Sequence, residues 1–241
     1  MTRFFRHIRK KLMEKKKTRS YMLYAFGEIF LVMIGILLAL QVNNWNEERK
    51  LQKRETKLLK EMRSDLMDQK DDLLFNIEHH QGSERSCRII RQALLNNMPF
   101  HDSLKVHFQQ AYNFTILENR QNAYTALLSE GIELINNDSL RFDITEYYEL
   151  GVPYQLEIQD ATVDFMKSAS ERHLSLFKNM NWSEPLEPWD YEGLKENRSY
   201  ISWLSFMVGN KHFEASTFQR LLDKNIVLTQ KIIEELGDQG D

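Results

Sequence analysis

Residues 21–42 read YMLYAFGEIFLVMIGILLALQV, and Glu28 is the one charged side chain among them. A helix needs about 20 mostly apolar residues to cross the hydrocarbon core of a bilayer, which is roughly 30 Å thick. The unbroken apolar run, 29–40, is too short alone, so residues 21–26 must contribute to the span. Aromatic residues flank the stretch where interface anchors are expected: Tyr21, Tyr24 and Trp45. The sequence therefore predicts one transmembrane helix over residues 21–42.

Two other interpretations of this stretch compete with an uncleaved anchor. A cleaved signal peptide also places basic residues before an apolar core. This apolar stretch is longer than usual, however, and residues 39–41 fit a small-x-small cleavage site poorly. A buried helix of a soluble core would not need the nine basic residues that precede residue 21. We therefore favour an anchor that stays in the membrane.

Basic residues are concentrated before the predicted span. Residues 1–20 contain nine Lys or Arg and one acid, Glu14. The nine are Arg3, Arg6, Arg9, Lys10, Lys11, Lys15, Lys16, Lys17 and Arg19. Six more follow the span, at positions 49, 50, 53, 54, 57 and 60. Because cytoplasmic flanks carry the excess of Lys and Arg, we expect a cytoplasmic N-terminus and a large extracytoplasmic domain.

The segment before the span also has an apolar pattern. Phe4, Phe5, Ile8 and Leu12 recur at helical spacing among the basic residues, which predicts a short amphipathic helix on an anionic membrane surface. The lysines at 15–17 also match a nuclear localisation signal, but their position directly before an apolar span favours the topology interpretation. We therefore expect residues 1–20 to form a basic cytoplasmic tail that contacts the lipid bilayer.

Three residues within the span predict contact with another helix. An ionised acid in an apolar stretch is costly, so Glu28 should be protonated, paired or turned toward another helix. Gly35 and Ala39 form a small-xxx-small pair, which lets two helices approach closely. Spacings of seven and four place all three on one helical face. They predict a homo-oligomer through the span; the alternative is that Glu28 bonds within its own helix or toward the nearer headgroups.

The rest of the chain is acidic. Removing residues 1–42 from the chain totals of 32 basic and 35 acidic residues leaves 23 and 33, a net charge of −10 for 43–241. Contacts with the phosphates of a nucleic acid need positively charged protein surface, so we expect no nucleic-acid partner for this acidic domain. Only 9 Gly and 4 Pro occur in the 241 residues, which favours long helices over glycine-rich phosphate loops.

Residues 24–29 (YAFGEI) and 34–47 (IGILLALQVNNWNE) resemble a family of uncharacterised single-span proteins from Gram-negative bacteria. Its members share an opening like residues 4–12 (FFRHIRKKL) and a YAxGEIxLVxIGILxALQxNNWNE segment, and this resemblance covers residues 4–50. A weaker resemblance involves Tyr124, Leu127, Ser129, Gly131, Leu134, Ile135, Asn137, Leu140, Arg141, Tyr147 and Tyr148. The resemblance implies a protein of the bacterial inner membrane with a helical domain, which the orientation above puts in the periplasm. It implies no activity.

Apolar residues after the span follow a heptad-like spacing in a charge-rich segment: Leu59, Met62, Leu66, Leu73 and Ile77. This stripe fits either a coiled-coil stalk between protomers or one helix of an intramolecular bundle. Gly82 predicts a break in the helix. We therefore divide this part of the chain into a juxtamembrane stalk helix over 43–81 and an extracytoplasmic helical bundle over 82–241.

Helices of ordinary length are predicted beyond Gly82, with no strand pattern of useful length. They cover 84–96, 104–117, 122–129, 132–135, 139–150, 154–179, 199–208 and 214–236. Breaks are expected at 151–153 and over the loop 181–189, and Asn137 is expected to cap the helix that follows it. The fold class is therefore all-α: a single N-terminal transmembrane helix that continues into a long helix and an extramembrane helical bundle.

No motif assigns an enzymatic reaction to this domain. Adjacent His79 and His80 point about 100° apart on a helix, so they do not readily share one metal ion. The sequence lacks paired Glu-xxx-His sets, cysteine pairs, nucleophile elbows and phosphate loops. Cys87 is the only cysteine and is expected to be a semi-buried packing residue. We therefore expect no enzyme, no metal site and no cofactor.

Aromatic residues gather in the second half of the domain: Tyr147, Tyr148, Tyr154, Trp182, Trp189, Tyr191, Tyr200 and Trp203. Aromatics at helical spacing are usually core, although such a set also lines ligand pockets or protein-binding faces.

Two classes of function remain. The first is a membrane-tethered protein-interaction or scaffold module for an unidentified membrane or periplasmic protein. The second is a small-ligand sensor whose transmembrane helix passes a shift to a partner protein. The sensor is the weaker expectation, because the 20 residues before the span are too few for an output domain.

Overall fold

The structure is a computed structural model that describes residues 18–179 and 184–238, the side chains of 18–21 and 238 excepted. The chain is 85% helical, and the described residues form no strand beyond one isolated bridge between Phe177 and Pro188. This confirms the all-α prediction. The predicted amphipathic helix and the basic side chains of the tail, Arg19 included, lie outside what is described, as does Trp182.

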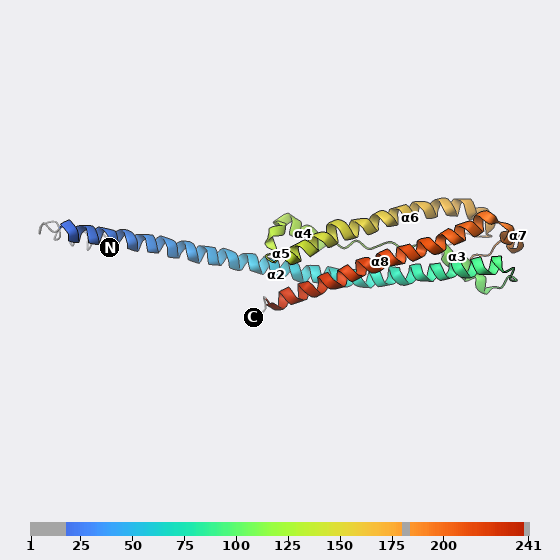
Figure 1. Cartoon of the computed structure of the whole chain (residues 1–241), viewed down its shortest axis with the longest axis horizontal. Coiled ribbons are helices and arrows are strands. Elements are labelled where there is room, and N and C mark those ends of the chain that lie inside the picture. Colours follow the sequence, from blue (N-terminus) through green and yellow to red (C-terminus); the bar gives the residue numbers. More distant parts are fainter. Residues whose placement is uncertain (1–17, 180–183, 239–241) are drawn as a thin grey trace. The chain divides into compact units, whose positions relative to one another are not determined.

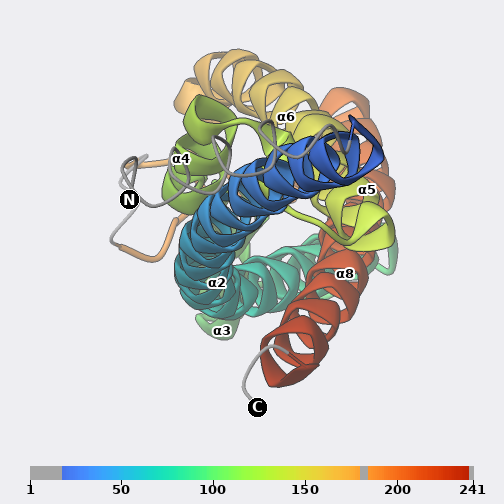
Figure 2. The same ribbon diagram turned by 90° about the vertical axis from the view of Figure 1, so that its left-hand side faces the viewer.

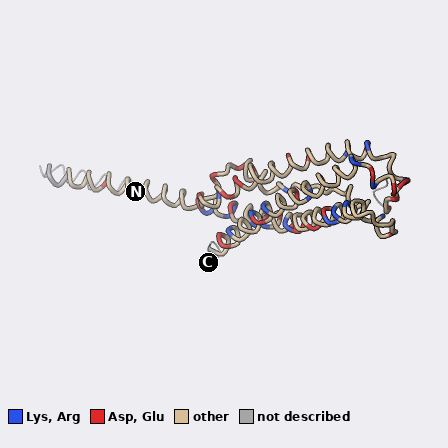
Figure 3. The backbone as a smooth tube through the Cα atoms, turned by 45° about the vertical axis from the view of Figure 1, so that its right-hand side comes forward, with Lys and Arg blue, Asp and Glu red and all other residues tan. Residues whose placement is uncertain are grey.

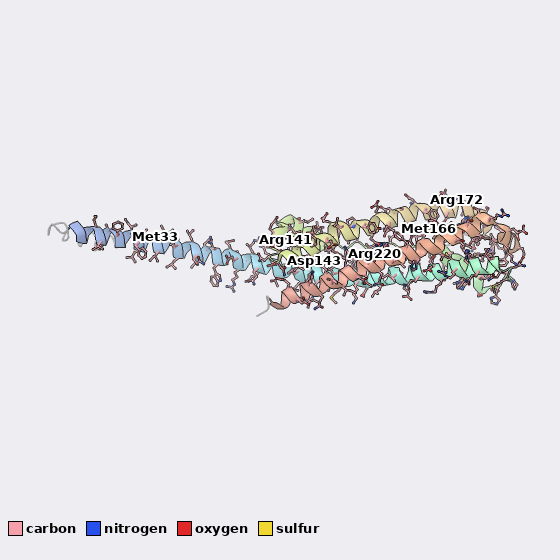
Figure 4. The ribbon with its side chains drawn as sticks, viewed as in Figure 1. Met33, Arg141, Asp143, Met166, Arg172 and Arg220 are labelled. Carbon is pink, nitrogen blue, oxygen red and sulfur yellow. The ribbon has the colours of Figure 1, made fainter. Side chains whose placement is uncertain are left out.

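The chain divides into two compact units, 1–54 and 55–241. In the first unit, the helix α2 (Thr18–Leu95) provides one stretch long and apolar enough to cross a membrane, and none of that apolar window is buried. Figure 3 shows that this stretch is almost free of charged residues, and Met33, labelled in Figure 4, is 47% exposed. The core helix of a soluble protein would be mostly buried, so the exposure of this stretch argues against the buried-helix interpretation.

The second unit is a bundle built on three long helices. Figures 1 and 2 show α6, α8 and the C-terminal part of α2 running side by side. The elements after α2 are α3 (Ser103–Ala111), α4 (Asn122–Glu130), η1 (Ile132–Leu134), α5 (Asp138–Glu146), η2 (Tyr147–Gly151), α6 (Val152–His173), η3 (Leu174–Leu176), α7 (Tyr191–Glu196) and α8 (Arg198–Asp238). The shorter elements close the two ends of the bundle.

Two apolar clusters form the core of the bundle. The first contains the predicted stripe Leu59, Met62, Leu66, Leu73 and Ile77, which is at most 7% exposed and packs with residues of α8 such as Phe218 and Ile232. The second contains Cys87 and Ile90 of α2 together with Tyr200 and Leu204 of α8. The stripe therefore belongs to an intramolecular bundle, and the coiled-coil stalk is not needed to bury it.

Two predicted interruptions of long helices are wrong: the break at Gly82 and the gap between the predicted helices 199–208 and 214–236. The helix α2 continues through Gly82 to Leu95, and α8 continues from Arg198 to Asp238 through Gly209, where two helices were predicted. A glycine inside a helix costs about 1 kcal/mol relative to alanine. Packing on both sides of each glycine outweighs that cost, because most helical stability in proteins comes from the buried face.

The predicted break at 151–153 is also wrong. The segment from α5 through η2 to α6 stays helical, and η2 is a turn of π-helix. Pro153 has no N–H and its ring collides with the carbonyl four residues back, so a regular α-helix cannot pass it without distortion. The wider turn directly before Pro153 absorbs that distortion, and the helix survives with a bulge.

Acidic side chains of α2 hold the segment that connects α3 to α5. Asp72 accepts a hydrogen bond from the backbone N–H of Glu118 at 3.0 Å, and Asp65 accepts one from Ala123 at 3.0 Å. Glu55, which is 1% exposed, accepts one from Asn136 at 2.9 Å. The predicted helix 104–117 ends at Ala111, because the chain beyond it is bonded to α2.

Other helix ends follow local chemistry. Asn137 caps α5, as predicted: its side chain accepts a hydrogen bond from the N–H of Leu140 at 3.1 Å. The helix α4 ends at Gly131, whose φ of 101° lies in a region that L side chains rarely adopt. The backbone at position 131 therefore requires glycine, whereas the helical backbone at position 82 does not.

A pair of glycine substitutions tests these assignments. Gly82→Ala should raise the free energy of unfolding by about 0.5–1 kcal/mol, because its Cβ meets only the Arg85 side chain, at 3.7 Å. Gly131→Ala should lower it by about 1–3 kcal/mol, because alanine is strained at that φ. Denaturant unfolding of the full chain in detergent measures both. A loss of stability in Gly82→Ala would mean that the chain bends at Gly82.

Candidate functional site

The three predicted interface residues of the span all lie on α2 within the first unit. Gly35 and Ala39 are exposed, and Glu28 is half-buried. A Cβ added at Gly35 would meet nothing within 4 Å, so the backbone there is open to close approach by another helix. The structure thus places the three residues on one helical element, and whether they join two copies stays a prediction.

A layer of polar side chains separates the two apolar clusters of the bundle. Its centre is the carboxylate of Glu214 on α8, which is 2% exposed. Four groups from α2, α6 and α8 approach this carboxylate: His80 Nδ1 at 2.7 Å, Lys211 Nζ at 3.0 Å, Thr162 Oγ1 at 2.5 Å and Asn210 Nδ2 at 2.7 Å. We call these five residues the polar layer. It links all three long helices at one level of the bundle.

The protonation of the polar layer follows from its contacts. Burial works to raise the pKa of Glu214, but the bond from His80 and the charge of Lys211 outweigh it and lower that pKa to about 2. Burial also lowers the pKa of His80, so its ring is neutral at pH 7. Because a carboxylate only accepts, Nδ1 of His80 carries the proton, and Nε2 accepts from Thr115 Oγ1 at 3.1 Å.

The polar layer suits a structural role better than a chemical one. His80, Lys211 and Glu214 are 2%, 0% and 2% exposed, so no substrate reaches them. A buried ion pair is costly unless its remaining hydrogen bonds are satisfied, as they are at this carboxylate. The layer therefore fixes the register of α8 against α2 and α6.

A groove runs between α8 and the helical segment from α5 through η2 to α6. It contains two hollows of about 250 and 230 Å³, which share Glu146 and Lys224 in their linings. These two side chains form an ion pair at 2.7 Å that lies between the hollows. Figure 4 labels Arg220, which lines the second hollow from α8, and Asp143, which lines the first from α5. We call this feature the α8 groove.

The π turn shapes the floor of the α8 groove. Tyr147 donates a hydrogen bond to Gln69 of α2 at 2.7 Å and accepts one from Asn225 of α8 at 3.2 Å. A Cβ added at Gly151 would lie 3.2 Å from Leu221 Cδ1, so glycine there lets η2 approach α8 closely. The turn is thereby fixed to both neighbouring helices. π turns inside α-helices frequently lie at functional sites.

The predicted aromatic set is mostly core. Tyr147, Tyr148, Tyr191, Tyr200 and Trp203 are at most 8% exposed, whereas Tyr154 and Trp189 are 50% and 66% exposed. Cys87 is fully buried, more deeply than predicted, and burial raises the pKa of its thiol to about 12, which makes it unreactive. Among the described residues, no group of three or more His, Cys, Asp or Glu is placed to hold a metal ion.

The sequence pattern missed the polar layer and the π turn. Lys211 and Glu214 have the i, i+3 spacing of an exposed pair, and His80 stood beside His79 as a weak metal candidate. Their common feature is that each falls on the apolar face of its helix, between the residues of the two core clusters. The available signal was a polar residue at an apolar position of two predicted helices: His80 in the stalk helix over 43–81 and Glu214 in the helix over 214–236.

The stability of the bundle should fall as the pH is lowered from about 6.5 to about 4. Burial lowers the pKa of His173 from 6.5 to about 4, so the unfolded chain binds a proton in this window before the folded chain does. The contribution of His173 to the stability of the bundle is therefore fully present above pH 6.5. In His173→Asn the loss over this window should be smaller. The remainder comes from His79 and His80, whose pKa values burial also lowers, and near the lower end of the window from Glu214, whose pKa is lowered to about 2. Unfolding midpoints at several pH values measure both slopes, and equal slopes would contradict the assignment.

Comparison with known proteins places the chain in a family. No curated protein and no solved structure matches it. A family model described as a family of unknown function matches residues 28–184, well over half of the chain. The match begins within the apolar stretch and covers the groove-forming segment from α5 through η2 to α6. The chain therefore belongs to this family of unknown function, DUF6090.

Proposed function

We propose that this protein is a membrane-anchored interaction or scaffold module without enzymatic activity. The apolar stretch of α2 would hold it in a bacterial inner membrane, with the N-terminus in the cytoplasm and the bundle in the periplasm. The exposure of that stretch and the excess of basic residues before it support this arrangement. The family-like motif around the span supports the bacterial assignment.

One observation on the bundle supports an interaction most directly. Phe206, Phe213 and Val227 of α8 are 53%, 44% and 54% exposed, and the ring of Phe206 lies 4.8 Å from the ring of Phe165 on α6. They follow one another at seven-residue steps, with Arg220 at the intervening position. We call these three apolar residues the α8 stripe. Exposed apolar side chains aligned at this spacing suit docking of another helix.

The partner that fits the α8 stripe is an amphipathic helix of a membrane or periplasmic protein. Such a helix would lay its own apolar face along Phe206 and Phe213, as in helix-on-helix recognition. A second contact, between copies of this protein, would use Glu28, Gly35 and Ala39 of the span. The two contacts are separate in sequence, so an assembly that uses both is a scaffold.

The alternative function is a small-ligand sensor coupled to a partner protein. The second hollow of the α8 groove supports it, since this hollow includes a buried amide with no hydrogen-bond partner among the described residues. Ligand pockets commonly combine apolar walls with a few polar groups of this kind.

Crosslinking and pull-down from native membranes tests the proposal. The intact chain should capture a reproducible partner, and Phe206→Ser/Phe213→Ser should lose it, because two apolar contacts of the α8 stripe are removed. Glu28→Leu should keep the partner and lose the crosslink between copies of the chain.

A matched double substitution, Phe142→Ser/Leu174→Ser, controls for changes in surface hydrophobicity. These residues are 67% and 55% exposed and lie outside the α8 stripe, so this variant should keep both products. The interaction fails as a function if the wild type captures no reproducible partner or if the stripe variant captures the same one. An unchanged copy-to-copy crosslink in Glu28→Leu contradicts the role of the span.

A further inference from the structure

The contact between α2 and α8 has one side that no described element covers. The two helices run antiparallel: Asn225 Nδ2 donates to the backbone oxygen of Leu66 at 3.0 Å, and Glu214 lies 2.7 Å from His80. Figures 1 and 2 show α8 beside the C-terminal part of α2, with α6 on the other side of this pair. The uncovered side is bordered by one row of residues from each helix.

The row on α2 alternates basic and apolar side chains. Steps of four, three and four residues place its members on one helical face: Arg63, Met67, Lys70 and Leu74. Met67 and Leu74 are 54% and 46% exposed. Asp65 and Asp72, which hold the segment that connects α3 to α5, lie on the opposite side of the core residues of α2. The row is therefore turned away from that segment.

The row on α8 alternates apolar side chains with an acid and amides. Steps of four, three, four and three residues place its members on one helical face: Gln219, Asp223, Ile226, Gln230 and Ile233. Ile226 and Ile233 are 45% and 42% exposed. Lys224 and Lys231, which form ion pairs with acids of α5, lie on the other side of α8. We call the two rows together the α2–α8 face.

The charges of the α2–α8 face are not balanced within one copy of the chain. Arg63 and Lys70 form no ion pair or hydrogen bond with any described residue. Among the described residues, Asp223 accepts a hydrogen bond from the amide of Gln219 at 2.9 Å and pairs with no cation. The row on α2 is therefore basic, the row on α8 is acidic, and each also carries two exposed apolar side chains.

We propose that the α2–α8 face joins two copies of this chain about a two-fold axis parallel to the long helices. Rotation about such an axis keeps each residue at its height along the bundle and lays α2 of each copy on α8 of the other. Because Leu66 is level with Asn225, Lys70 falls two residues, or ~3 Å along the axis, from Asp223 of the second copy. Met67 falls equally close to Ile226 of the second copy.

A second copy fits this face better than an unrelated helix does. A basic or an acidic helix would match one of the two rows, whereas a second copy matches both and repeats each contact by symmetry. A two-fold axis across the helices would instead lay α2 on α2 and α8 on α8, so that like charges would face each other. It would also point the two spans in opposite directions, which the proposed anchoring in one membrane does not permit.

Cysteine crosslinking in native membranes tests the interface, because Cys87 is the only native cysteine and is fully buried. Two full chains with different tags are co-expressed, one with Met67→Cys and one with Ile226→Cys, and treated with a short bis-maleimide. The product that carries both tags should be several times more abundant than with Met67→Cys and Val227→Cys. Val227 is 54% exposed, but it lines the first hollow of the α8 groove.

Charge reversal tests the pairing of Lys70 with Asp223. Lys70→Glu or Asp223→Lys, placed in both copies, should each lower the 67–226 product severalfold, because like charges then face each other at two symmetric sites. The two changes combined in each copy should restore the product, because the pair is then reversed and not removed. Lys167→Glu on α6, whose side chain is 71% exposed, should leave the product unchanged.

The proposal is overturned if the 67–226 product does not exceed the 67–227 control, or if the combined reversal stays as low as the single changes. It is also overturned if two copies with Met67→Cys crosslink as well as the 67–226 pair, because α2 then lies against α2. The α8 stripe and Glu28 are scored on other crosslinked products. The interface can therefore fail while the proposed function stands, and the reverse.

Discussion

The carboxylate of Glu214 is the constraint on which the bundle depends. It is buried at the level where the two apolar clusters meet, and polar groups of α2, α6 and α8 contact it at once. Apolar packing alone allows helices to slide by a turn, because Leu and Met side chains tolerate many neighbours. A buried carboxylate does not, because any shift of α8 that separates it from His80 of α2 or Thr162 of α6 removes its partners on the other helices. The polar layer therefore sets one register for three helices.

That register produces the α8 groove. With Glu214 fixed against Thr162, the N-terminal turn of α6 must meet α8 near Leu221, where Gly151 allows close approach. Pro153 forces the preceding turn to widen, and the π turn then reaches α2 and α8 through Tyr147. The hollow beside Gln155 lies next to this turn. The π turn that accommodates Pro153 within a long helical segment thus helps to form the α8 groove.

Much of the fold was predictable because it depends on local spacing. The span follows from a run of apolar residues, the buried face of α2 from the stripe Leu59 to Ile77, and the start of α5 from Asn137. The continuation of α2 through Gly82 and of α8 through Gly209 was not predictable, because the low helix propensity of glycine is outweighed by the packing of a long buried face. His80, Lys211 and Glu214 escaped prediction because their partnership joins distant parts of the chain. The buried amide of Gln155 also escaped prediction, because the sequence does not indicate which buried polar groups lack a hydrogen-bond partner.

The central claim is that the contacts of Glu214 with other helices hold the bundle in register, and a double-mutant cycle on Glu214 and His80 of α2 tests it most directly. The free energy of unfolding of the full chain in detergent would be measured for His80→Leu, Glu214→Gln and the combination. Glu214→Gln alone should cost about 3–5 kcal/mol, because it leaves the Lys211 charge buried without a counter-ion. The double variant should lose at least about 1 kcal/mol less than the sum of the single losses. Additive losses would contradict the account.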